Sequence, residues 1–349
     1  MRELKIGTRG SALALWQANH IKDRLLELGI ESSLQIIKTK GDKILDVSLA
    51  KIGGKGLFTK ELEEQLLSGE IDLAVHSLKD VPVDLPESLT LACITQREDV
   101  RDCLVSYHYP NLLDLPESAK VGTTSLRRSM QIKALRQDLC TLSLRGNVQT
   151  RLSKLESGEF HAIILAHAGL KRLGITHIPY ITPLSTDSMI PAMGQAALGI
   201  ECREDDYELV EALQQLHCQR TALCTQAERE FVRVLEGGCQ VPIGVYCEIL
   251  DSSTHDSSNE SDEIDEQWEQ NPTNQEPQPK DSRNQATRRQ DFIRIEAIIG
   301  LPDGSKMLRE SITEHASKAN EAARALAHSL IAQGAKDLLL QAQKFFNNL

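Results

Sequence analysis

The sequence predicts an α/β protein: two successive α/β units are followed by a small α+β unit. Three observations lead to this fold class. Apolar runs of strand length alternate with amphipathic stretches over about the first 200 residues, the last third instead contains a hairpin pattern, and a long polar segment interrupts that last third. The length of 349 residues predicts two or three domains rather than one.

The first unit begins with a short strand at residues 4–7. This strand turns through 8–11 into a helix that has Ala14, Ala18 and Ile21 on one face and stops at Gly29. Three further elements are expected: a strand at 34–38, a helix over 57–68 closed by Gly69, and a buried strand in the apolar run 71–75.

The same pattern repeats in the second unit. A strand at 120–122 leads through 123–125 into a helix that ends at Arg136. The elements expected next are a strand at 139–144, a helix at 147–156 and a strand at 161–166. Alternating strands and helices predict parallel sheets in both units.

The third unit has a different pattern. Two alternating runs flank Pro302-Asp303-Gly304, which predicts a hairpin. The expected elements are a helix at 221–235, a loop at 236–242, strands at 243–249, 292–299 and 306–312, and a helical end with a break at Gly334. This mixture indicates a small α+β domain.

Residues 251–290 form a polar segment between two of these strands. Of its 40 residues 16 are Ser, Asn or Gln, and the apolar ones are Ile264, Trp268 and Ala286. Such a composition cannot offset the entropy of ordering by burial, so we expect a disordered insertion. Its 10 acids and 4 bases contribute −6 to the net charge of −11.

Composition argues against several functions. Because 39 Lys plus Arg stand against 50 Asp plus Glu, we expect no nucleic-acid or anionic-membrane partner. No apolar run approaches the roughly 20 residues of a membrane span, and no signal-peptide core follows Met1, so we expect a cytoplasmic protein. The 8 cysteines include no CxxC pair and no His/Cys cluster, which predicts reduced thiols and no metal site.

Three strand-to-helix turns share a design that suits anions. The turns at 8–11, 51–55 and 123–125 each combine helix N-terminal amides with a hydroxyl or a cation. One such turn is weak evidence, since Ser or Thr there is more often only an N-cap, but three together predict an anion site. Neither a Walker A sequence nor GxGxxG is present, so nucleotide binding has no specific support.

Arginines gather after the predicted strands of the second unit. For any one of them a solvated surface charge is the simpler explanation. Their convergence at the ligand-binding end of an open α/β sheet predicts a ligand with several carboxylates or phosphates. These arginines are Arg127, Arg128, Arg145, Arg151 and Arg172.

Asp80 follows the predicted strand 71–75 at the same kind of position. Surrounded by cations it is expected to stay ionised, so it could stabilise a cationic intermediate or exchange protons. A salt bridge to Lys79, or a turn-capping role before Pro82, explains its position equally well.

Cys239 lies in a Gly-Gly loop, whereas Cys93 and Cys140 fall within apolar runs and are expected in the core. An exposed thiol can be a nucleophile or an attachment point, although most single cysteines are neither. His76 and His167 are expected to pack or cap.

Six motifs, in order along nearly the whole chain, resemble those of the porphobilinogen deaminase (hydroxymethylbilane synthase) family. They are IGTRGSALA at 6–14, GGKGLF at 53–58, VHSLKDVP at 75–82, GTTSLRR at 122–128, LRGNVQTRL at 144–152 and EGGCQVPIG at 236–244.

The resemblance implies a specific architecture. Two α/β domains similar to periplasmic binding proteins face each other across a cleft, and a smaller third domain carries the cofactor loop. Domain 1 would comprise residues 1–95 and 196–213, domain 2 residues 101–189, and domain 3 residues 218–349. The resemblance places a dipyrromethane cofactor on Cys239 through a thioether and the catalytic carboxylate on Asp80.

It also implies the remaining site residues. The cofactor-binding positions are Ser77, Lys79, Thr123, Ser125, Arg127, Arg128, Arg145 and Gly146. The substrate-binding positions are Arg9, Ser11, Lys51, Arg151 and Arg172. No metal is implied, and we expect a monomer.

The implied reaction agrees with the arginine pattern. Porphobilinogen carries acetate and propionate groups, so a growing chain of linked pyrroles accumulates carboxylates. Asp80 would stabilise the cation left by loss of ammonia and handle pyrrole N–H protons. Four condensations and a hydrolysis would release linear hydroxymethylbilane, with hinge motion between domains 1 and 2 as a hypothesis for making room.

Two departures from the family pattern stand out: the long polar insertion 251–290, which we expect to be dispensable, and Ala196 where Gly is usual. Two other functions stay open. One is a non-catalytic small-polyanion-binding protein of the same two-lobed architecture, and a weaker one is a cysteine-nucleophile hydrolase, for which no base partner is evident.

Overall fold

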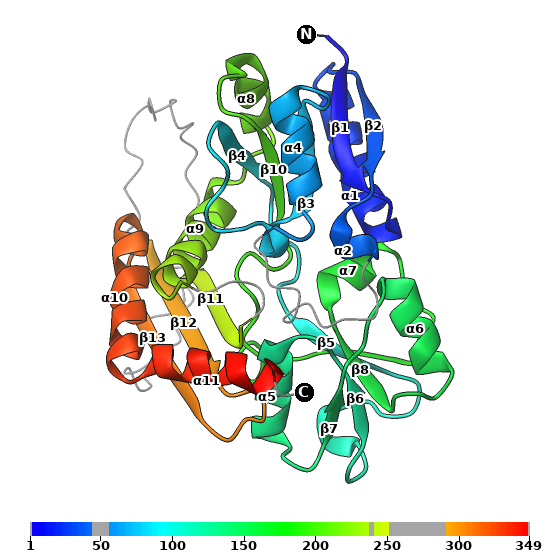
Figure 1. The fold of residues 1–349 in the computed structure, drawn as a ribbon, viewed down its shortest axis with the longest axis vertical. Helices are drawn as coiled ribbons and strands as arrows, with labels where there is room; N and C mark the ends of the chain where they lie inside the picture. Colours follow the sequence, from blue (N-terminus) through cyan, green and yellow to red (C-terminus); the bar gives the residue numbers. More distant parts are fainter. Residues whose placement is uncertain (1, 44–55, 237–240, 251–290, 348–349) are drawn as a thin grey trace, which may run out of the picture.

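The computed structural model describes residues 2–43, 56–236, 241–250 and 291–347, and it contains three β-sheets with helices packed on them (Figure 1). The insertion 251–290, predicted to be disordered, lies outside the described residues. The α/β fold class with a C-terminal α+β unit is confirmed. The boundaries of the three domains stay a prediction, and we refer below to sheet units.

The first sheet unit has the strand order β2-β1-β3-β10-β4. Helices α1 and α8 share an apolar cluster on one face, while α4 packs Leu62 and Leu66 on the other. The elements are β1 Leu4–Arg9, α1 Ala12–Glu27, β2 Ser32–Ile37, α2 Lys40–Lys43, α4 Lys60–Ser68, β3 Leu73–Ser77, β4 Leu89–Ile94, β10 Leu198–Arg203 and α8 Tyr207–Gln214.

The second sheet unit has the order β7-β6-β8-β5-β9. Helices α6 and α7 cover one face, and Ile132 of α5 packs into the cluster on the other. The elements are β5 Asp102–Ser106, β6 Lys120–Gly122, α5 Leu126–Leu135, β7 Cys140–Leu142, α6 Val148–Glu156, β8 Ala162–Ala166, α7 His167–Arg172 and β9 Tyr180–Pro183.

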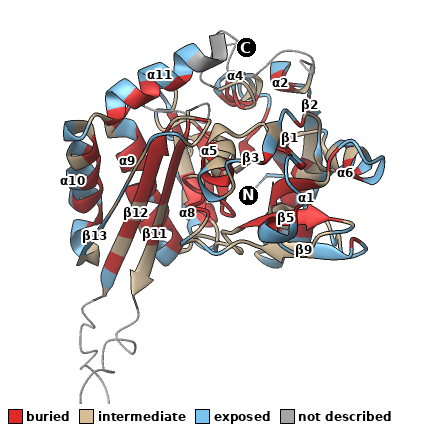
Figure 2. Cartoon of the chain, turned by 90° about the horizontal axis from the view of Figure 1, so that it is seen from below, coloured by how far each residue is buried: buried red, intermediate tan, exposed pale blue. Residues whose placement is uncertain are grey.

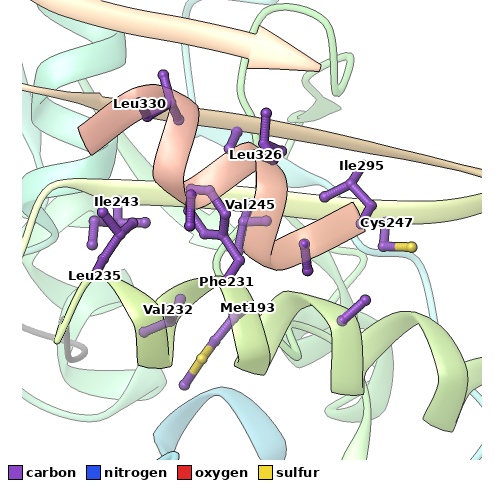
Figure 3. Packing of buried hydrophobic residues seen from close by; sticks show 14 of the residues in the cluster. Met193, Phe231, Val232, Leu235, Ile243, Val245, Cys247, Ile295, Leu326 and Leu330 are labelled. Atoms are coloured by element: carbon purple, nitrogen blue, oxygen red, sulfur yellow. The ribbon is translucent and has the colours of Figure 1, made fainter. Parts of the chain in front are cut away.

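The third sheet unit is the antiparallel sheet β11-β12-β13, with α9, α10 and α11 over one face. Figure 3 shows Phe231 of α9 and Leu326 and Leu330 of α10 meeting over strand β11, and Figure 2 shows the burial along these strands. The elements are α9 Gln219–Val234, β11 Ile243–Leu250, β12 Phe292–Gly300, β13 Met307–His315, α10 Ala319–Ala332 and α11 Ala335–Asn347.

The prediction of parallel sheets is wrong for part of each unit. Strand β10 is antiparallel to both β3 and β4, and β5 is antiparallel to both β8 and β9. The cause is topological: the chain crosses from the first unit to the second through residues 95–101 and returns through 184–197. Each crossing delivers a strand that runs against its neighbours.

Helix ends follow the predicted glycines. Gly29 and Gly69 have φ of 76° and 74°, the left-handed region that Gly adopts without steric cost, and they follow α1 and α4. Gly334, with φ of 99°, separates α10 from α11. Cys93 is buried as expected, but Cys140 is exposed because the short strand β7 lies at the edge of its sheet.

The second and third units contact each other through α5. Met130 of α5 is fully buried in a cluster with Ile190 and Ile298. At the β12–β13 turn Gly304 has φ of 71°, and a Cβ there would lie 2.7 Å from the backbone nitrogen of Ala134. Only Gly permits this approach, so the predicted hairpin also serves as a contact.

None of the described helices is both long enough and apolar enough to span a bilayer. Within the described ranges no group of three or more His, Cys, Asp or Glu side chains is arranged to hold a metal ion.

Candidate active site

The site is organised by the turn that follows β3. A single 3₁₀ turn covers Leu78–Asp80, and the backbone N–H of Leu78 donates to the carbonyl of Ala197 at 3.0 Å. Leu78 and Val81 are fully buried, which anchors both ends of the turn. Lys79 and Asp80 lie between these anchors and are partly exposed. The fold therefore presents an ammonium group and a carboxylate side by side.

Ser77, the last residue of β3, is held from the opposite direction. Its hydroxyl accepts a hydrogen bond from Nε2 of Gln17 on α1 at 2.8 Å. Gln17 is buried, so this bond fixes the end of the strand against the helix that covers it.

Lys79 lies among charges of both signs. Burial, together with Arg128 and Arg127, lowers the pKa of its ammonium to about 8, against the opposing effect of Asp80 and Asp102, which raise it. Its Nζ lies 3.5 Å from Oε1 of Gln195. Lys79 and Asp80 belong to the first unit and the two arginines to the second, so the site joins both units.

The turn before α5 is built from predicted hydroxyls. Ser125 is the N-cap and accepts from the backbone N–H of Arg128 at 3.4 Å, while the Thr123 hydroxyl accepts from the N–H of Ser125 at 3.1 Å. This is the capping role that the simpler interpretation of such turns predicts. Because these hydroxyls bond backbone N–H groups, the side chains of Arg127 and Arg128 are positioned by other contacts.

Arg127 and Arg128 are buried and share one carboxylate. Nη1 of Arg127 lies 2.7 Å from Oδ2 of Asp102, and Nη2 of Arg128 lies 2.7 Å from Oδ1. Although burial alone would raise the pKa of Asp102, the two arginines hold it well below its usual range. One negative charge against two positive charges leaves a net positive charge at this wall of the site.

The turn before α6 contributes three predicted residues. Gly146 has φ of 107°, and a Cβ there would lie 2.6 Å from Cγ2 of Thr150, so the turn requires Gly. Nε of Arg151 donates to the Gly146 carbonyl at 2.9 Å. Burial, Arg128 and Arg145 lower the pKa of Arg151 to about 10, whereas the charge of Asp80 raises it. Arg145 and Arg151 therefore lie within electrostatic reach of one another, and Arg151 within reach of Asp80.

Arg9 and Ser11 lie at the end of β1. Arg9 forms an ion pair with Asp42, with Nε at 3.1 Å from Oδ1, and its guanidinium lies over the Phe58 ring, 4.2 Å from the centroid. Ser11 caps α1 by accepting from the N–H of Ala14 at 3.3 Å.

Arg172 ends α7 beside the returning connection. Its Nη2 donates to the carbonyl of Ala196 at 2.5 Å, and its guanidinium lies 5.9 Å from the Trp16 ring centroid. Cys239 and Lys51, two further predicted site residues, lie outside the described residues.

Besides Gln17, sequence reasoning missed three other buried polar residues that link the units around the site. Asp102 binds both arginines, Gln195 bridges it to Lys79, and Glu228 of α9 accepts from Arg97 and from the N–H of Gly194 at 2.7 Å each. The one available sequence signal was an acid directly before the apolar run 103–105, which places Asp102 at the start of a buried strand. A pocket of about 280 Å³ on the second unit, lined by Tyr107, Phe160 and His161 among others, contains none of the predicted site residues.

Comparison with known families gives two matches. A family model described as "Porphobilinogen deaminase, dipyromethane cofactor binding domain" matches residues 4–211, and one described as "Porphobilinogen deaminase, C-terminal domain" matches residues 222–254.

Curated relatives match along nearly the full length. A protein named porphobilinogen deaminase from Helicobacter hepaticus is 54% identical over 98% of this chain and 96% of its own length. One of the same name from Nitratiruptor sp. is 51% identical over 98% and 97%.

Solved structures give weaker likenesses. The periplasmic VFT2 domain of BvgS from Bordetella pertussis has 13% identity and a TM-score of 0.38, over 63% of this chain and 90% of that one. A YaeC-family lipoprotein from Enterococcus faecalis has 13% identity and a TM-score of 0.38, over 64% and 94%.

Proposed function

Because the chain belongs to the porphobilinogen deaminase family, we propose that Asp80 is the catalytic carboxylate of its hydroxymethylbilane synthase activity. The enzyme joins four porphobilinogen molecules stepwise with loss of ammonia and hydrolyses the product to linear hydroxymethylbilane. Its cofactor is dipyrromethane. The observation that supports the role of Asp80 is its position next to Lys79 and within the electrostatic reach of Arg151 from the other sheet unit.

The cations of the site suit the chemistry of substrate and cofactor. Both carry acetate and propionate groups, and guanidinium groups bind carboxylates with two parallel hydrogen bonds. We assign cofactor binding to Ser77, Lys79, Thr123, Ser125, Arg127, Arg128, Arg145 and Gly146, and substrate binding to Arg9, Ser11, Lys51, Arg151 and Arg172. The net positive charge beside Asp102 supports this assignment.

The positively charged and negatively charged residues of the site have different proposed roles. Positive groups bind and orient the carboxylates, while Asp80 stabilises the cation that develops as porphobilinogen loses ammonia and accepts or returns the pyrrole N–H proton. When bound, the dipyrromethane supplies the pyrrole carbon to which substrate is joined. We propose that it is held by a thioether to Cys239.

The proposal also covers the domain boundaries, the oligomeric state and the cellular location of the enzyme. We propose three domains, residues 1–95 with 196–213, 101–189 and 218–349, and a monomeric cytoplasmic enzyme. Support for a reducing compartment comes from the described cysteines, which are free thiols. The net charge of −11 supports the expectation that no nucleic acid or membrane is bound.

The first test is intact mass under denaturing conditions. We expect the wild-type protein to exceed its sequence mass by two porphobilinogen units less two ammonia molecules, and Cys239→Ser to lack this addition. Cys140→Ser, which removes an exposed thiol elsewhere, should keep it. Wild-type protein that stays unmodified after incubation with porphobilinogen would contradict the cofactor assignment.

A second test separates catalysis from binding. Asp80→Asn should lower turnover by about 100-fold or more because the carboxylate is lost, while carboxylate binding by the arginines remains. Asp84→Asn, four residues further on, is the matched control and should turn over normally. Full turnover by Asp80→Asn would favour the non-catalytic polyanion-binding alternative, which the family match does not favour.

A further inference from the structure

We propose that Asp102 is a positioning residue that acts through Gln195 to hold Lys79 beside Asp80 in its charged form. Asp102 lies outside every predicted set of site residues. The proposal rests on the proposed function, because it concerns how one group of that site is prepared for its ligands.

Asp102 has an unusual number of partners. It is fully buried at the first position of β5, directly after the chain crosses between sheet units. Oδ1 accepts from Nη2 of Arg128 at 2.7 Å and from Nε2 of Gln195 at 3.0 Å, while Oδ2 lies 2.7 Å from Arg127. The carboxylate therefore joins α5, β5 and the returning connection at one point.

The contacts of Gln195 fix the direction of its side-chain amide. Its Nε2 donates both to the carbonyl of Val100 at 2.8 Å and to Asp102 at 3.0 Å, so both amide hydrogens are used. Oε1 must then point the opposite way, where it lies 3.5 Å from Nζ of Lys79. Without Asp102 the amide could turn and bring its own hydrogens towards the ammonium group.

The charge on Lys79 depends on the same carboxylate. Burial and the neighbouring Arg127 and Arg128 of α5 favour the neutral amine, and only Asp80 and Asp102 among these neighbours favour the ammonium. Asp80 is assigned to the reaction, where its charge stabilises the cation that develops on the substrate. Asp102 is buried and committed to structure, so it is the carboxylate that can keep Lys79 charged throughout the cycle.

The test compares pH profiles of kcat/KM for the holoenzyme. Lys79 has a pKa of about 8, so its deprotonation should shape the alkaline limb. In Asp102→Asn we expect this limb to move to lower pH by about one unit. At the pH where the two profiles differ most, kcat/KM of the variant should be about tenfold lower than that of the wild type. Asp138→Asn removes a partly exposed ion pair with Arg136 in the same unit and should leave the profile unchanged.

Two further variants distinguish positioning from damage to the fold. Gln195→Met keeps Asp102 with its arginines, so it should fold and shift the limb in the same direction. In a Lys79→Arg background Asp102→Asn should add no shift, because a guanidinium does not titrate in this range. A merely structural role would lower activity equally at every pH.

A readout independent of turnover is the pH dependence of Lys79 acetylation, followed by peptide mass spectrometry. The midpoint should fall in both Asp102→Asn and Gln195→Met. Unchanged midpoints and limbs in both folded variants would overturn the proposal. If wild-type enzyme makes no hydroxymethylbilane, the proposed function fails instead, and the acetylation midpoints still decide the role of Asp102.

Discussion

Among single residues, Ala196 has a backbone conformation that suits Gly. Its φ of 75° lies in the left-handed region, where a Cβ is strained. We expect Ala196→Gly to raise the free energy of unfolding by about 1 kcal/mol, measured by urea denaturation. Ala197→Gly, at the next and fully buried position, should instead lower it by about 1 kcal/mol. If both substitutions changed the free energy of unfolding equally, the left-handed conformation of Ala196 would carry little strain.

Glu63 carries a second residue-scale prediction. Burial raises the pKa of this carboxyl group, and the nearby Glu201 raises it further. The folded state therefore holds its proton more strongly than the unfolded state, so the group's contribution to stability is lost as pH rises. Glu63→Gln, which cannot ionise, should gain stability relative to the wild type as pH rises above the ordinary range of Glu.

Urea denaturation across a pH series checks this prediction. Glu64→Gln alters the exposed neighbour on the same helix, whose carboxylate pairs with Lys60. That control should show no comparable trend with pH. A difference between Glu63→Gln and wild type that does not change with pH would contradict the raised pKa.

The residues that we propose to contact ligands could be predicted from the sequence better than the buried residues that pack behind them. Asp80 and the arginines follow strands at the end of an α/β sheet, a position with functional meaning. Asp102 and Gln195 act through partners 26 and 93 residues away in sequence, which no local pattern encodes. His76, which was expected to pack or cap, is buried, and its partner Glu201, at 3.0 Å, could not be predicted because it lies far away in the sequence.

At the scale of elements, α9 is joined to both connections by Glu228. This fully buried carboxylate accepts from Nη1 of Arg97 at 2.7 Å and from the N–H groups of Gly194 and Cys247 at 2.7 and 2.9 Å. One helix of the third unit therefore fixes both crossings between the other two.

Loss of this charge should be costly, because it leaves Arg97 buried beside a neutral group. We expect Glu228→Gln to lower the free energy of unfolding by about 3 kcal/mol. Glu230→Gln removes a carboxylate two residues along that pairs with Arg233 and Arg324, whose side chains are nearly half exposed. It should cost less than about 1 kcal/mol in the same denaturation experiment. Comparable losses would refute the role of Glu228 as a junction.

Local patterns predicted some elements and not others. The helices that end at Gly and the β12–β13 hairpin could be recognised because turn residues and periodicity are local. The directions of β5 and β10 could not, because an antiparallel partner is chosen by the path of the chain between units. Edge strand β7 was expected to bury Cys140, but among the described strands none lies on its outer side.

At the scale of the whole molecule, the insertion 251–290 is expected to be dispensable. Leu250, the residue before it, is paired across the β11–β12 ladder with Phe292, the second residue after it, so a short turn can join the two strands. Replacing 251–290 with a four-residue Gly/Asn turn should change turnover less than twofold and leave the unfolding midpoint within a few degrees. Loss of activity in folded protein would show that the segment has a role.

The position of β10 has a consequence for synthesis on the ribosome. This strand joins β3 to β4 in the first sheet, yet it leaves the exit tunnel about 100 residues after β4. The second sheet takes all its strands from 102–183 and is complete before β10 exists. A nascent chain is therefore expected to fold its second unit first. Until β10 is made, the first unit stays incomplete and exposes apolar surface, to which chaperones can bind.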